Sequence, residues 1–103
     1  MSMMRPGDLE EQIRSYRTLL QQASTTSDYA YELKLREVLH EVVRDFKRGV
    51  YSEDEAHTVW KGIIPPIIVT ENNVIKDNGI FNIAFDSADA LVRLIAARRR
   101  KNK

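Results

Sequence analysis

The sequence predicts a mostly helical α+β protein. Two observations favour helices: a long amphipathic stretch in the first half, and a Ser-x-x-Glu helix start that follows it. A third observation is an Asn-Gly pair between two short apolar runs, which predicts a β-hairpin in the second half. We therefore expect an antiparallel helical hairpin, a third short helix, a β-hairpin and a C-terminal helix, all within a single domain of residues 1–103.

The longest predicted helix runs from Asp28 to Gly49. Its apolar residues recur at spacings of three, four and seven, which is the period of a helix with one wide buried face. These residues are Tyr31, Leu35, Val38, Leu39, Val42, Val43 and Phe46. Gly49 is expected to end the helix because glycine adopts the left-handed conformation of a helix C-terminus at little cost. Every other segment is shorter, so we expect each to pack against this helix.

Two shorter helices flank it in the sequence. The first is expected to begin at Asp8 and to end near Ala23, before a run of serine and threonine whose hydroxyls compete for backbone hydrogen bonds. The next begins at Ser52, where Glu55 completes a capping box, and ends before Pro65. Because the connection between the first two helices is short, they should lie antiparallel and side by side.

After the prolines the pattern changes to that of strands. Ile67–Thr70 is β-branched and suits a strand. The predicted hairpin has arms at Val74–Lys76 and Ile80–Phe85, joined by Asp77–Gly79. Phe81, Ile83 and Phe85 would share one face of the second arm. Asp86 or Ser87 would then cap a final helix with a stripe of Ala88, Leu91, Val92 and Ile95.

Composition narrows the class of protein. The chain has no cysteine, which excludes a disulfide framework and thiolate metal sites, and fits a cytoplasmic location. Its longest apolar run, within residues 63–69, is far too short to span a bilayer, so we expect a soluble protein with no membrane partner.

Charge is distributed unevenly along the chain. Residues 86–103 hold six basic and two acidic residues, whereas the rest holds ten basic and 13 acidic ones. We expect residues 1–7 to be disordered and 98–103 to form a solvated basic tail. In an alternative hypothesis, this tail contacts nucleic-acid phosphates without reading bases. The residues concerned are Arg98, Arg99, Arg100, Lys101 and Lys103.

No motif indicates an enzyme. The glycines are isolated, so no phosphate-binding loop exists, and the serines at predicted caps and loops need no catalytic explanation. Glu37 and His40 have the spacing of a helical metal-binding pair, but such a site needs a second copy, which only a dimer would supply. A metal enzyme built around His40 is therefore the least favoured alternative, and we expect no catalytic residue, metal or cofactor.

The wide apolar face of the long helix favours a binding role. It covers more area than the first helix can hide, so either the hairpin or a second subunit must cover the rest. We therefore predict a small non-enzymatic interaction protein with an adaptor, regulatory or assembly role, which forms a homodimer or binds another protein. The candidate interface residues are Val38, Leu39, Val42, Val43, Phe46 and Trp60.

Overall fold

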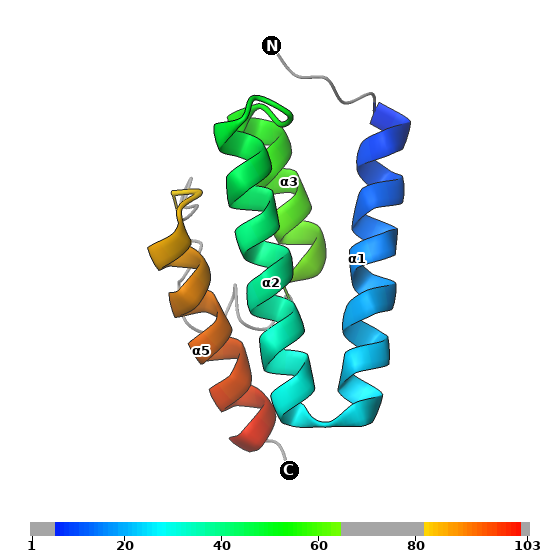
Figure 1. The fold of residues 1–103 in the computed structure, drawn as a ribbon, viewed down its shortest axis with the longest axis vertical. Coiled ribbons are helices and arrows are strands. Elements are labelled where there is room, and N and C mark those ends of the chain that lie inside the picture. The colour runs from blue at the N-terminus through cyan, green and yellow to red at the C-terminus, as the bar shows by residue number, and fades with distance from the viewer. Residues whose placement is uncertain (1–5, 65–81, 102–103) are drawn as a thin grey trace.

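The computed structural model describes residues 6–64 and 82–101 of the chain. These residues form four helices, namely α1 (Pro6–Thr26), α2 (Asp28–Lys47), α3 (Glu53–Ile63) and α5 (Phe85–Lys101). α2 lies between α1 and α5, and α3 lies behind α1 and α2 (Figure 1). Among the described helices, α2 packs against each of the other three. None of the four is long and apolar enough to cross a membrane.

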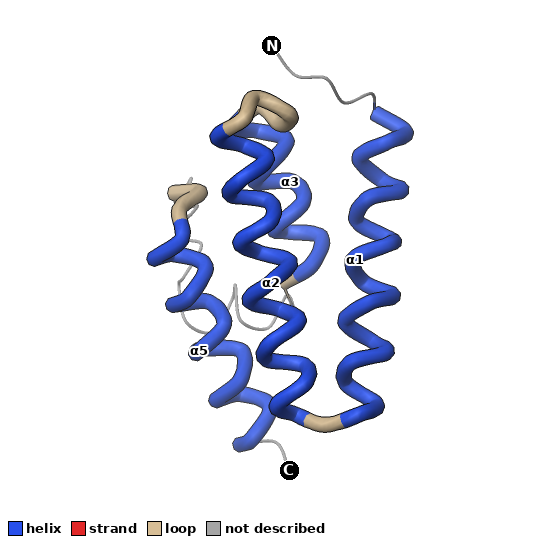
Figure 2. Tube along the Cα trace, viewed as in Figure 1, coloured by secondary structure: helices blue, strands red, loops and turns tan. Residues whose placement is uncertain are grey.

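The predicted α+β class is wrong, because the part of the chain that the structure describes contains helices and no strand (Figure 2). The strand at Ile67–Thr70 and the first arm of the hairpin lie outside the described residues. The end of the second arm is described: Asn82–Ala84 precede α5, and Phe85 is its first residue. The apolar residues at alternate positions, including Ile83 and Phe85, suggested a strand, but this alternation extends over only a short segment. Helical bonding begins there instead, with the Ala88 amide donating to the Ala84 carbonyl at 3.0 Å.

α1 and α2 form the predicted antiparallel hairpin (Figure 1). α1 is longer than expected at both ends, starting at Pro6 and continuing to Thr26. Its C-terminal hydroxyls do not end the helix, because they bond back to carbonyls of the preceding turn; Ser24 Oγ, for example, donates to the Gln21 carbonyl at 2.7 Å. Ser27 alone separates the helices, and its hydroxyl caps α2 by accepting from the Ala30 amide at 2.9 Å.

The signals at the α2–α3 turn are confirmed. Gly49 has a φ of 84°, the left-handed conformation expected of it. The Val50 amide donates to the Asp45 carbonyl at 2.9 Å, and the Gly49 amide donates to the Phe46 carbonyl at 3.1 Å, which together form a Schellman motif. The capping box is also present. The Ser52 amide donates to Glu55 Oε1 at 2.8 Å, and the Glu55 amide donates to Ser52 Oγ at 3.2 Å.

α1 and α3 approach closely at a glycine. A Cβ atom on Gly62 would lie 2.8 Å from Cγ2 of Ile13, a distance that real Cβ atoms do not tolerate. The Gly62 carbonyl accepts a hydrogen bond from Arg17 Nε at 2.6 Å. Gly62 thus lets α1 pack directly on α3.

We predict that Gly62→Ala lowers the free energy of unfolding by about 1–2 kcal/mol, because the methyl group overpacks this contact. Urea denaturation would measure the change. In an Ile13→Ala background the clashing atoms are gone, so the same substitution should be neutral or stabilising through its better helix propensity. Gly7→Ala is the matched control, since a Cβ there has nothing within 4 Å. An equal loss of stability in both backgrounds would contradict the packing explanation.

Candidate functional site

The predicted interface residues lie in the core of the chain itself. Val38, Leu39, Val42, Val43 and Trp60 are each at most 2% exposed, and Phe46 is partly buried against the same cluster. α1, α3 and α5 pack around α2 and supply much of the rest of this core. The apolar width that suggested a second subunit is therefore largely covered within one chain, and of these residues only Phe46 is more than 2% exposed.

The basic C-terminal residues do not trail into solvent as a separate tail, since α5 continues through them to Lys101. Arg99 Nη2 lies 3.4 Å from Asp28 Oδ1, and its guanidinium carbon lies 4.0 Å from the centre of the Tyr31 ring. Arg100 Nη1 donates to Glu32 Oε1 at 2.7 Å. These contacts place cations at the C-terminus of α5 and anions near the N-terminus of α2, where each helix dipole favours them. Lys103 lies outside the described residues.

His40 connects α2 to α5. Its Nε2 donates to Asp89 Oδ1 at 2.8 Å, and Arg36 Nε lies 3.4 Å from the same oxygen. The His40 ring meets the ring of Phe85 edge-on, with 5.0 Å between centroids. Lys47 Nζ lies 4.9 Å from the centroid of that Phe85 ring. His40 is thus part of the seam between two helices, about half-way along α2.

The structure does not bring the candidate metal pair together. His40 is bonded to Asp89, whereas Glu37 pairs with Lys34, at 3.5 Å between Nζ and Oε2. Among residues 6–64 and 82–101, no three side chains of His, Cys, Asp or Glu gather into a group that could hold a metal ion. The hydrogen bond between His40 and Asp89 has an ordinary structural explanation, because it satisfies two half-buried polar side chains at a helix contact.

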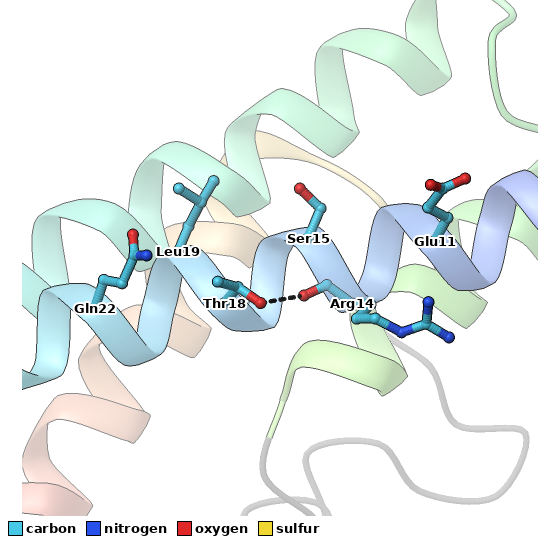
Figure 3. Close-up of a pocket in the computed structure, with 6 residues that line it drawn as sticks. All are labelled: Glu11, Arg14, Ser15, Thr18, Leu19 and Gln22. Carbon is cyan, nitrogen blue, oxygen red and sulfur yellow. Dashed lines mark hydrogen bonds between the residues drawn. The ribbon is translucent and has the colours of Figure 1, made fainter.

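A shallow hollow on the described surface lies along the outside of α1. It is lined by Glu11, Arg14, Ser15, Thr18, Leu19 and Gln22, which all come from this one helix (Figure 3). Thr18 Oγ1 donates to the Arg14 carbonyl at 3.0 Å, so its hydroxyl is already engaged within the helix. Binding pockets for small molecules are concave and enclosed by several elements, which this open groove is not.

A buried polar cluster joins α1, α2 and the α2–α3 turn. Tyr16 and Tyr51 are each 3% exposed, and the Tyr16 hydroxyl is hydrogen-bonded to Glu41 and to Tyr51. Burial raises the pKa of Tyr16 well above its ordinary value of 10.0, and the negative charge of Glu41 adds to this. Burial, followed by the charge of Asp45, raises the pKa of Tyr51 to about 12. Both hydroxyls therefore stay protonated at neutral pH and act as structural hydrogen-bonding groups.

Three large apolar side chains are exposed among the described residues. Tyr29 is 70% exposed, Leu33 is 44% exposed and Leu19 is 40% exposed. Tyr29 and Leu33 are four positions apart, so they are neighbours on the outside of α2. The sequence-based predictions did not single out Tyr29 or Leu33. The available signal was that Tyr29 and Leu33 fall outside the three, four and seven spacing of the buried face.

Comparisons with protein-family models, curated proteins and solved structures find no match to this chain.

We predict that the buried tyrosine cluster makes stability fall at high pH. Because the folded pKa of Tyr51 is raised, its contribution is complete below about pH 10 and is lost as pH rises toward 12. Tyr51→Phe should therefore flatten the decline of the unfolding free energy in this window by up to about 1.4 kcal/mol per pH unit. Urea denaturation between pH 8 and 12 measures the slope. Tyr29→Phe, which removes an exposed hydroxyl, should keep the wild-type slope, and identical slopes in all three proteins would refute the assignment.

The stacking of Arg99 on Tyr31 leads to a second prediction. Arg99→Ala should lower the free energy of unfolding by about 1–2 kcal/mol, because it removes a cation–π contact and an ion pair with Asp28. Arg93→Ala removes the same charge from the exposed side of α5 and should cost less than about 0.5 kcal/mol. Thermal and urea unfolding would compare the two variants. Equal effects would mean that Arg99 contributes only its charge.

Proposed function

We propose that this chain is a small non-enzymatic interaction protein, and that it binds another protein through the exposed pair Tyr29–Leu33 on α2. The observation that carries the proposal is the exposure of two large apolar side chains one helical turn apart, beside a well-packed core. Aromatic residues such as tyrosine are enriched at the centres of protein interfaces, because a large rigid ring buries much area at small entropic cost. An adaptor, regulatory or assembly role in the cytoplasm fits such a surface.

The pair has rigid support. Its neighbours Asp28 and Glu32 are tied to Arg99 and Arg100 on α5, and Tyr31 lies under the Arg99 guanidinium. This end of α2 is therefore held on one side while its outer side stays open. A preorganised surface binds more tightly than a mobile one, since less conformational entropy is lost on binding.

The partner in this proposal includes a second copy of the chain. Such a homodimer would form through Tyr29 and Leu33 and not through the buried face of α2. Two copies related by a two-fold axis would place the same surface against itself. Burial of Tyr29 and Leu33 from both copies would then provide the apolar centre of the contact.

The nucleic-acid alternative has less support. Arg99 and Arg100, two of the cations expected to contact phosphates, already pair with Asp28 and Glu32. A phosphate would have to displace these carboxylates, so part of the affinity from counterion release would be lost. We therefore rank phosphate binding below protein binding.

The proposal predicts a site-specific cross-link. A photoreactive phenylalanine derivative in place of Leu33, in cells that express the chain, should yield a discrete covalent adduct with a protein. The same derivative in place of Thr18, which is exposed on the outside of α1, is the matched control and should yield none. The measurement is the mass of the adduct by gel and mass spectrometry. An adduct of twice the chain mass identifies a second copy, and a different mass identifies another protein.

Tyr29→Ser, introduced next to the photoreactive position, should reduce the adduct several-fold, since the ring supplies much of the contact area. The absence of an adduct at position 33, or equal adducts at positions 33 and 18, would contradict protein binding at this surface.

A further inference from the structure

The exposed pair is one end of a longer surface on α2. We define the outer stripe as Tyr29, Leu33, Arg36, His40, Arg44 and Lys47. Successive members are three or four positions apart, so they occupy one face of the helix. At 1.5 Å per residue the stripe is about 27 Å long. Its first two members are apolar, and Arg36, Arg44 and Lys47 over the rest are basic. Asp89 of α5 lies against Arg36 and His40 near the middle of the stripe.

The cations of the stripe differ in how far they are engaged. Arg36 shares Asp89 with His40, so its charge is partly neutralised. Arg44 and Lys47 are exposed, and within the described ranges neither has a carboxylate at ion-pair distance. Lys47 Nζ lies 4.9 Å from the centroid of the Phe85 ring, a contact that leaves its ammonium donors for another partner.

We infer from this arrangement that the partner is an acidic protein segment that carries apolar side chains, and that it docks lengthwise on the outer stripe. The inference rests on the proposed function and specifies its partner. Carboxylates of such a segment would pair with Arg44 and Lys47, while its apolar side chains would cover Tyr29 and Leu33. An amphipathic helix of five turns has the length and the spacing to do both.

Two carboxylates beside the stripe favour a peptide over a nucleic acid. Glu37 and Glu41 follow Arg36 and His40 directly in the sequence, and both are exposed, Glu37 by 67% of its side chain. A phosphate backbone carries charge continuously and would lie close to these carboxylates, which repel it. A peptide can place its carboxylates at the cations alone. An apolar side chain of the peptide would also bury Leu33, whereas a phosphate offers no apolar surface to cover it.

The same charges oppose self-association through the whole stripe. A two-fold contact along it would bring the cations of the two copies together, while the nearby carboxylates of Glu37 and Asp89 already pair with Lys34, Arg36 and His40 of their own chain. The full length of the stripe therefore fits a partner of opposite charge better than a second copy of this chain.

The test uses a fluorescein-labelled 20-residue helical peptide with two leucines one turn apart near one end and four glutamates along the same face. Fluorescence anisotropy with the intact chain should show binding with a Kd in the micromolar range, typical of a single docked helix of about this size. Replacing the glutamates by glutamine, or the leucines by alanine, should weaken binding by about tenfold or more.

Variants of the chain locate the site. Arg44→Gln with Lys47→Gln should weaken binding of the glutamate peptide about tenfold and leave the glutamine peptide unaffected. Arg14→Gln with Lys61→Gln removes the same charge from exposed positions of α1 and α3, and should change the Kd by less than about twofold. Thermal unfolding of both double variants shows that the fold is retained.

The alternatives give different results. No binding of the glutamate peptide, or equal losses in the two double variants, would overturn the inference. Tighter binding of a 20-base-pair DNA duplex, lost in the Arg44 and Lys47 variant, would assign the stripe to nucleic acid instead. A protein cross-link at position 33 together with failure of the peptide would leave the proposed function standing and reject only the acidic partner.

Discussion

The rest of the structure depends on the burial of α2 on three sides. Leu35, Leu39, Val42 and Val43 on this helix have no measurable exposure, and α1, α3 and α5 each pack against it. Full burial of such side chains contributes about 1.5–3 kcal/mol each, more than any single ion pair at this surface. The other helices are short or have long polar faces, so α2 is what makes their apolar stripes part of one core. Residues 6–64 and 82–101 therefore form a central helix with three neighbours.

Polar contacts then fix how α5 sits on α2. Arg99 and Arg100 hold one end of the seam, and Asp89 with His40 and Arg36 holds it further along. These pairs are partly exposed, so each adds little to stability on its own. They lie along the same helix contact as Leu91, Val92 and Ile95, which are buried. On α2 itself, Tyr29, Leu33, Arg44 and Lys47 stay exposed.

This division of α2 into a covered and an open side determines where binding can occur. A face buried by three neighbours cannot also be an interface, so the residues first expected to bind a partner are unavailable for it. What remains is a stripe with Tyr29 and Leu33 at one end and Arg44 and Lys47 at the other. Two hollows along α1 are each lined by this one helix and lack the enclosure by several elements that a small-molecule site needs. The proposed protein partner would meet the chain at this stripe.

The sequence by itself determined α2, α3 and the turn between them, where the signals are local, but it misplaced both ends of α1. The apolar period of α2, the glycine at position 49 and the capping box of Ser52 and Glu55 each act within a few residues, and the structure contains all of them. The segment before α5 was misjudged because a short apolar alternation fits a strand and a helix start about equally well, and packing decides between them.

Only the tertiary structure decided which surfaces are covered. The periodicity of α2 predicted a wide apolar face but not whether the chain itself or a second subunit would bury it. Arg99 meets Asp28 across 71 positions of sequence, and His40 meets Asp89 across 49. No local sequence pattern predicts such pairs, because they depend on which helices pack against each other. The sequence alone shows that the residues of the outer stripe share a helical spacing. The burial of the opposite face of α2, which makes the stripe a candidate site, is decided by the tertiary structure.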